Sequence, residues 1–322
     1  MRLLTIYLTC CLWLGTMSAH GKIVFESGRD GDLEIYSMKS DGTDQTRLTH
    51  NETSDFSAAW SPNGRQIAFT RTWDDEDLEI YVMDADGSNP RNLTQHPTLD
   101  SDPDWSPDGS QIAFTSDRVN NGLSLFVMDA DGTNVRQLTK GPFDVMPKWS
   151  PNGKRIAFEA MLGLGHGRQI YVMNADGTKR WQVSEPMHNT GMFMMGWSPD
   201  GKKILYTAAV DYSVMKSFLV IATLHRRRHE AIKHERVPLP KKMHLDGAAW
   251  GADGKSVLVT LRTAPREEGG VWNIYRFHLP DGPLIQLTDH PATDGGAHEW
   301  NPRLPVSPQE LAPKRWGDVK SN

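Results

Sequence analysis

Cysteine is almost absent from the sequence. The 322 residues contain only Cys10 and Cys11, and both lie in an apolar N-terminal stretch. The rest of the chain can therefore have neither a disulfide framework nor a catalytic cysteine. An excess of basic residues is also missing, since 35 Lys and Arg stand against 40 Asp and Glu, a formal net charge of −5. This balance argues against general nucleic-acid binding.

Catalytic signatures are missing as well. The sequence contains no Gly-x-Ser-x-Gly nucleophile elbow, and the His-Glu pairs at His229 and His298 do not continue as His-Glu-x-x-His. No segment has the spacing of a calcium loop or of a dinucleotide-binding turn. We therefore predict no catalytic residue, no metal site and no cofactor, and expect that the protein is not an enzyme.

Residues 1–19 have the pattern of a secretory signal peptide. Arg2 supplies the positive start, an apolar run extends from Leu3 to Leu14, and small residues precede an expected cleavage after Ala19. The apolar run is too short to span a bilayer stably, so we expect no transmembrane segment in the mature chain. The predicted location is the periplasm or the extracellular space.

A repeated motif organises the remaining chain. The segment from Trp105 to Phe114 reads Trp-Ser-Pro-Asp-Gly-Ser-Gln-Ile-Ala-Phe, in which Ser-Pro-Asp-Gly is a tight turn between two strands. Full or partial copies recur every 44–53 residues and mark the expected blade boundaries near Trp60, Trp105, Trp149, Trp197, Trp250 and Trp300. Periods of this length indicate propellers or arrays, and no long helical period is present.

Each unit contains two further apolar runs, of the types Ile-Tyr-Val-Met and Arg-x-Leu-Thr, which makes four short antiparallel strands. Residues 22–49 supply three strands without a Trp strand, and Ala297 to Trp300 supply a Trp strand without the other three. We therefore predict an all-β, six-bladed propeller over residues 20–302. Its C-terminal strand would complete the N-terminal blade and close the ring. Residues 303–322 are predicted to be an extended tail.

These three motifs, in fixed order over about residues 22–300, resemble the WD40-like (PD40) repeats of the TolB family of β-propellers. The resemblance implies a six-bladed propeller, a periplasmic or extracellular location and a bias toward binding partners. TolB proteins also have an N-terminal α/β domain, through which they work with the Tol–Pal envelope machinery. Here the expected leader is followed directly by the first propeller strand, so the resemblance covers the propeller and lacks that domain.

The loops that precede each Trp strand are the candidate site for a partner or ligand, because functional residues usually lie in such variable loops. They are rich in His and Asp and would meet around one mouth of the central channel: His50, Asp55, His96, Asp100, Asp144, His188, His244, Asp246, His290 and Asp294. Three of these Asp residues stand five positions before a Trp, which favours loop capping repeated with the blade over a ligand site.

Two other segments leave alternatives open. Met187 to Met195 contains thioethers and an imidazole that could bind Cu(I), but methionine more often fills irregular core space. The basic insert from His225 to His234 could contact an anionic partner, or it could be a solvated loop.

We expect a monomeric, exported binding scaffold that recognises a protein or peptide partner through the loop-rich face. The alternative is a metal-dependent carbohydrate-active enzyme, similar to oligosaccharide lyases, with a His/Asp site at the channel mouth. An enzyme of this kind would need at least three such side chains converging on one metal ion.

Overall fold

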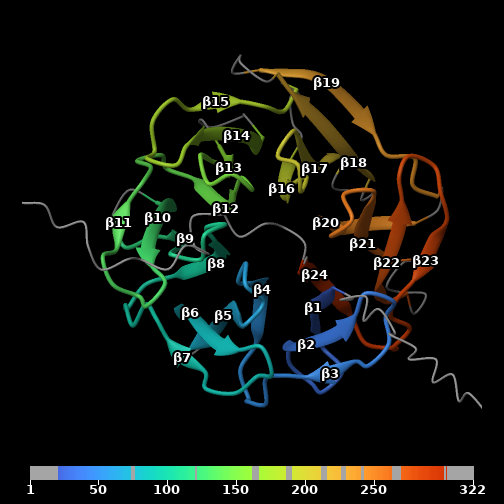
Figure 1. Ribbon diagram of the computed structural model, residues 1–322, viewed down its shortest axis with the longest axis horizontal. Helices are drawn as coiled ribbons and strands as arrows, with labels where there is room; N and C mark the ends of the chain where they lie inside the picture. Colours follow the sequence, from blue (N-terminus) through green and yellow to red (C-terminus); the bar gives the residue numbers. More distant parts are fainter. Residues whose placement is uncertain are drawn as a thin grey trace, which may run out of the picture.

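The computed structural model describes residues 21–73, 77–119, 122–161, 167–185, 191–211, 216–225, 230–240, 243–262, 270–300 and 302. Their strands form six four-stranded sheets that stand around a central axis, as Figure 1 shows. Within these ranges no helix is long and apolar enough to cross a membrane. The predicted leader and the predicted tail, residues 303–322, lie outside the described residues.

Five blades are continuous in the sequence, and each is built of four consecutive antiparallel strands, numbered from the axis outward. Their strands are β4 (Asp55–Trp60), β5 (Gln66–Trp73), β6 (Asp77–Asp84) and β7 (Arg91–Asn92); β8 (Asp100–Trp105), β9 (Gln111–Ser116), β10 (Ser124–Asp129) and β11 (Arg136–Gln137); β12 (Asp144–Trp149), β13 (Arg155–Ala160), β14 (Gln169–Asn174) and β15 (Trp181–Gln182); β16 (Gly191–Trp197), β17 (Lys203–Asp211), β18 (Lys216–Leu224) and β19 (Ala231–Arg236); β20 (His244–Trp250), β21 (Ser256–Arg262), β22 (Trp272–His278) and β23 (Leu284–Gln286).

The sixth blade joins the two ends of the propeller. Its strand order is β24 (Asp294–Trp300), β1 (Lys22–Ser27), β2 (Glu34–Lys39) and β3 (Thr46–Arg47). The C-terminal strand β24 pairs antiparallel with β1, with Trp300 opposite Lys22. The predicted six blades and the predicted closure of the ring are both confirmed. Because β24 pairs with β1, the inner edge of β1 is not left unpaired.

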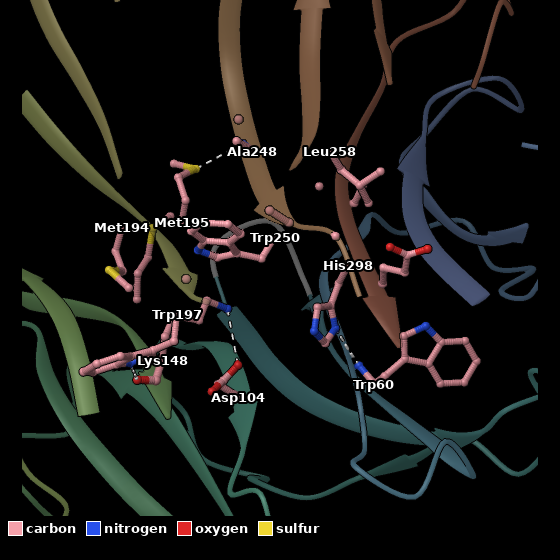
Figure 2. A pocket seen from close by; sticks show the side chains of 18 of the residues that line it. Trp60, Asp104, Lys148, Met194, Met195, Trp197, Ala248, Trp250, Leu258 and His298 are labelled. Atoms are coloured by element: carbon pink, nitrogen blue, oxygen red, sulfur yellow. Dashed lines mark hydrogen bonds and ion pairs between the residues drawn. The ribbon is translucent and has the colours of Figure 1, made fainter. Parts of the chain in front are cut away.

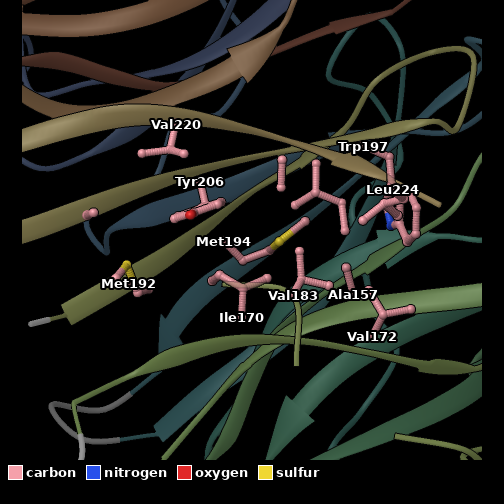
Figure 3. Close-up of a cluster of buried hydrophobic side chains, with 13 residues drawn as sticks. Ala157, Ile170, Val172, Val183, Met192, Met194, Trp197, Tyr206, Val220 and Leu224 are labelled. Carbon is pink, nitrogen blue, oxygen red and sulfur yellow. The ribbon is translucent and has the colours of Figure 1, made fainter. Parts of the chain in front are cut away.

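Apolar side chains between neighbouring blades form the core. In one cluster Ile80 of β6 packs with Phe114 of β9, and both side chains are fully buried. Figure 3 shows another cluster, in which Ile170 from one blade meets Met194 and Tyr206 from the next. Because each blade is covered on both faces, its middle strands are apolar at successive positions, as the sequence predicts.

The Ser-Pro-Asp-Gly turns stack on one another around the ring. A Cβ atom built on Gly109, which has a φ of 72°, would lie 3.8 Å from Pro62 Cδ of the preceding blade. Gly64 is the equivalent glycine of the blade that follows the composite blade, and it lies against the Trp300 indole instead of a proline. Trp300 Nε1 donates a 3.0 Å hydrogen bond to Pro62 O. Side-chain packing therefore closes the ring together with strand pairing.

The second type of turn, Asp-Ala-Asp-Gly, is built by its own side chains. Asp86 Oδ1 accepts hydrogen bonds from Ser88 N at 3.0 Å and from Ser88 Oγ at 2.6 Å. The same arrangement recurs at Asp41, Asp131 and Asp176. These contacts agree with the hairpin-turn interpretation of the repeated Asp residues.

The blade formed by β16–β19 departs from the others. The sequence leaves two interpretations of the insert from His225 to His234, a contact for an anionic partner or a solvated loop. The structure places its last residues in the outer strand β19 (Ala231–Arg236), and residues 226–229 lie outside the described residues. Pairing with β18 satisfies the backbone of this strand, so its polar composition does not prevent strand formation.

Candidate functional site

Four of the predicted site residues are buried at the start of an inner strand, where each carboxylate is at most 1% exposed. They form ion pairs of 2.7–3.0 Å with arginines of the same blade: Asp55 with Arg71, Asp100 with Arg118, Asp144 with Arg180 and Asp294 with Arg29. An arginine of the same blade therefore neutralises each of these carboxylates.

The arginines of these pairs also stack on aromatic rings. The Arg71 guanidinium lies 5.4 Å from the centroid of Phe69 and 4.6 Å from that of Tyr81. Arg29, Arg118 and Arg180 contact the equivalent ring pairs of their blades. Cation–π contacts and buried ion pairs hold the inner strand to the two middle strands. This structural role explains why an Asp recurs five positions before the Trp of the repeat.

The four predicted histidines that the structure describes do not converge on one point. His50 is exposed, His96 Nδ1 lies 2.8 Å from Thr98 Oγ1, and His290 Nδ1 accepts a 3.1 Å hydrogen bond from Ala292 N. His244 begins β20, whereas His188 lies outside the described residues. Among the described residues no group of three or more His, Cys, Asp or Glu is placed to hold a metal ion.

A cavity of about 960 Å³ runs along the central axis between the six inner strands. Of the nine predicted site residues within the described ranges, Asp246 alone belongs to its lining. The repeat tryptophans line it instead, together with the prolines of the Ser-Pro-Asp-Gly turns: Trp60, Trp105, Trp149, Trp197, Trp250 and Trp300, with Pro62, Pro107, Pro151 and Pro199. One end of the channel is therefore a ring of large apolar side chains.

Bulges in the inner strands set which side chains reach the channel. The register shifts within β4, β8 and β12, and Ser57, Asp102 and Met146 stand there with φ of 52–56°. A similar shift in β20 falls beside Asp246. All four residues line the cavity. A bulge breaks the alternation of the strand and redirects a side chain, in this case toward the axis.

The bulges in β4, β8, β12 and β16 are held by the preceding blade. The backbone N–H of Ser57 donates to Glu26 Oε1 at 2.6 Å, and that of Asp102 donates to Thr70 Oγ1 at 3.2 Å. The equivalent acceptors for Met146 and Met194 are Thr115 Oγ1 and Glu159 Oε1. Each acceptor is the residue directly after the Phe of an Ile-Ala-Phe type of strand. This position of the repeat therefore holds the backbone of the bulge, whichever residue stands at the bulge.

The channel half opposite the tryptophans is acidic. Burial raises the pKa of Glu26 to about 7, and the carboxylates of Asp246 and Asp102 raise it further against the Ser57 hydrogen bond. Behind the wall, burial also raises the pKa of Glu159 to about 7, against a hydrogen bond from Met194 N and an ion pair with Arg168; Glu159 itself does not line the cavity. The carboxylate of Asp102 accepts hydrogen bonds of 3.0–3.2 Å from Ser57, Ser101 and Thr115 hydroxyls. Clustered acids in a walled channel attract cations.

The middle of the channel contains a basic residue and a neutral imidazole. Lys148 Nζ lies 3.6 Å from Asp104 Oδ1, whose other oxygen accepts from Trp149 N at 2.7 Å. His298 Nδ1 accepts a 3.0 Å hydrogen bond from Trp60 N, and burial together with Lys148 lowers the pKa of His298 to about 4. Figure 2 shows His298 and Trp60 on one side of the cavity and Met194 and Met195 on the other.

The methionine side of the channel is apolar and adaptable. Met146, Phe193 and Met195 line the cavity, and Met195 Sδ accepts a 3.1 Å hydrogen bond from Ala248 N. Met194 is 3% exposed and belongs to the core between two blades. Residues 187–190 of the segment from Met187 to Met195, for which copper binding and core filling were both open, lie outside the described residues.

Sequence reasoning missed the side chains that line the channel: Glu26, Asp102, Asp104, Lys148 and His298. A usable signal exists in the alignment of the repeats. The residue three positions before Trp is Ser57, Asp102 or Met146 in three successive blades, a variation in polarity that the paired Asp five positions before Trp does not show.

Known proteins resemble this chain in its fold. The model of the TolB beta propeller domain family, PD40, matches residues 54–159. A search of curated protein sequences returned no match.

Solved structures cover most of the chain at low sequence identity. TolB from Acinetobacter baumannii is 18% identical with a TM-score of 0.69, over 87% of this chain and 67% of that one. A putative TolB from Agrobacterium tumefaciens is 14% identical with a TM-score of 0.64, over 87% and 97%. An oligogalacturonate lyase in complex with manganese is 16% identical with a TM-score of 0.57, over 84% and 74%. At these identities the likeness shows the fold.

Proposed function

We propose that this chain, a TolB-like six-bladed β-propeller built of PD40 repeats, is an exported binding scaffold that holds a protein or peptide partner at the acidic end of its central channel. The observation that carries the proposal is the lining of the channel. Its recurring strand bulges present unlike side chains, Ser57, Asp102, Met146 and Asp246, to one cavity. The predicted signal peptide supports export to the periplasm or the extracellular space.

The chemistry of the channel fits a partner segment with both basic and apolar side chains. Asp102 and Asp246 supply negative charge to the same end of the cavity, and Glu26, with a pKa of about 7, adds a charge that is only partly developed at neutral pH. Met146 and Phe193 supply an apolar wall, and methionine adapts its shape to a bound side chain. A Lys or Arg of the partner would meet the carboxylates, with adjacent apolar residues packed against the methionine side.

Partner capture with cross-linking from an envelope extract tests this proposal. We expect a partner that the unaltered protein captures and that an Asp102→Asn, Asp246→Asn variant captures at least tenfold less. Asp131→Asn, in an exposed turn away from the cavity, is the matched control and should capture normally. Equal capture by all three proteins, or no captured partner, would refute a partner site in the channel.

The alternative function is that of a metal-dependent lyase. It draws on the fold shared with the manganese-bound oligogalacturonate lyase, and a fold alone does not establish an activity. Cleavage of oligogalacturonate in the presence of manganese is the direct assay. Turnover that the Asp102→Asn, Asp246→Asn variant loses would replace the binding proposal with the enzymatic one.

A further inference from the structure

The outer strand β19, which runs from Ala231 to Arg236, is unusual among the outer strands of the propeller. It has six residues, whereas the outer strands of the other blades have two or three. It lies at the rim of the molecule in Figure 1, next to β18. A strand of this length at a sheet edge offers backbone donors and acceptors to another chain.

Ile232, Lys233 and Glu235 of β19 face solvent, whereas His234 packs on Tyr206 and Arg236 on Phe218 of the same blade. Ile232 is 58% exposed, the highest value among the exposed large hydrophobic residues of the described chain. Lys233 and Glu235 have side chains that are 62% and 47% exposed, and they form a 2.7 Å ion pair with each other along the strand. The edge therefore presents one cation and one anion on a common face, next to the exposed Ile232.

The pairing with β18 determines which backbone groups point outward. Val237 N donates to Leu219 O at 2.8 Å, and the register places Glu235 opposite Ile221 and His234 opposite Ala222. Hydrogen-bonded and non-hydrogen-bonded pairs alternate in an antiparallel ladder. Glu235 and Lys233 therefore direct their backbone groups toward β18, and His234 and Arg236 direct theirs away from it.

We propose that β19 binds β19 of a second copy of this chain in an antiparallel pair centred on His234. This register makes a hydrogen-bonded pair of the two His234 residues, whose backbone groups already point outward. It also places Lys233 of each copy opposite Glu235 of the other, in the closely spaced non-hydrogen-bonded pairs. The intrastrand ion pair thereby becomes a network of four charges across the dyad.

The structure favours this register over its neighbours. A shift by two residues places Lys233 opposite Lys233 or Glu235 opposite Glu235, and like charges directly opposite one another are unfavourable. A shift by one residue pairs an outward-facing backbone with an inward-facing one, which loses the hydrogen bonds. The bulge at Ile232, between the pairs Leu224–Ala231 and Thr223–Lys233, ends the regular stretch on one side. The dimer goes beyond the proposed channel function, since β19 does not line the cavity, and it replaces the monomer expected from sequence.

Charge reversal tests the dimer in solution. Sedimentation should show a concentration-dependent dimer for the unaltered protein, at concentrations up to about 1 mM. Lys233→Glu alone and Glu235→Lys alone should each weaken it about tenfold or more, because each creates two like-charge pairs. An equimolar mixture of these two variants should dimerise again, since each supplies the charge that the other lacks.

The outcomes are distinct. Lys202→Glu reverses a comparably exposed ion-paired lysine in a turn and is the control, which should leave the dimer unchanged. A protein that is monomeric throughout, or a dimer that both single reversals leave intact, would overturn the proposal. So would a mixture that remains monomeric while each variant keeps its fold by circular dichroism.

A disulfide test fixes the register independently. With Cys10 and Cys11 changed to Ser, His234→Cys should form an intermolecular disulfide under mild oxidation, because the residue on the dyad faces itself. Lys233→Cys should form far less, because its partner is Glu235 of the other copy. Equal cross-linking at the two positions would reject the register.

Discussion

The closure of the ring can be tested by adding one methyl group at Gly64. A Cβ at this position would lie 2.5 Å from Trp300 Cζ2 and 2.8 Å from Cδ2, so the indole would have to move. At Gly109, in the same turn of the next blade, the nearest atom would be Pro62 Cδ at 3.8 Å. The φ values of the two glycines are 66° and 72°, so the backbone strain of Ala is nearly the same at both sites.

The two substitutions should therefore differ by the steric term alone. A left-handed Ala costs about 1–2 kcal/mol, which is the expected loss for Gly109→Ala. Gly64→Ala should lose a further 1–3 kcal/mol, about the cost of overpacking, because Trp300 is also held by its hydrogen bond to Pro62. Urea unfolding of both variants gives the comparison. Equal losses would show that Trp300 does not close the ring, whereas a smaller difference in a Trp300→Leu background would confirm the contact.

Three further predictions concern the ion pairs and the channel. Asp100→Ala should cost about 3–5 kcal/mol in urea unfolding because it leaves Arg118 unpaired, and adding Arg118→Leu should restore part of this loss. Glu26 and Glu159 have folded pKa values of about 7, above the ordinary 4.5, so the folded state binds more protons and stability should fall as the pH rises from 4.5 to 7. Thermal unfolding at pH 5 and pH 8 should show this fall, and Glu26→Gln should reduce it. Asp102→Ser should lower the pKa of Glu26 in an NMR titration while changing stability by less than about 1 kcal/mol; an unchanged Glu26 titration would contradict the proposed acidic cluster.

Most of the fold could be predicted because its signals are local. Turn chemistry in Ser-Pro-Asp-Gly sets each hairpin, and the repeat of the motif counts the blades. The fragment from Ala297 to Trp300 then had to be the missing inner strand of the first blade, which the pairing of β24 with β1 confirms. The strand β19 was missed because its residues, from Ala231 to Arg236, carry no apolar alternation.

The site was harder to predict because burial, and not sequence position, decides what a charged side chain does. Asp55 and Asp100 looked like members of a loop cluster, yet each is neutralised by an arginine that the sequence separates from it by 16 or 18 residues. Asp102 stands only two positions after Asp100 and faces the channel instead. No rule of strand alternation separates these two acids, since both would point to the same face of a regular strand.

The bulge resolves this difference and also explains why the channel can vary. Its backbone is fixed by the preceding blade, through the hydroxyl of Thr70 or Thr115 or the carboxylate of Glu26, so the ring does not depend on the side chain at the bulge. Ser57 and Met146 accept the same left-handed backbone as an acid does in another blade. In the binding function that we propose, this arrangement separates the residues that build the ring from the few channel side chains that contact a partner. Those channel side chains can then change without cost to closure.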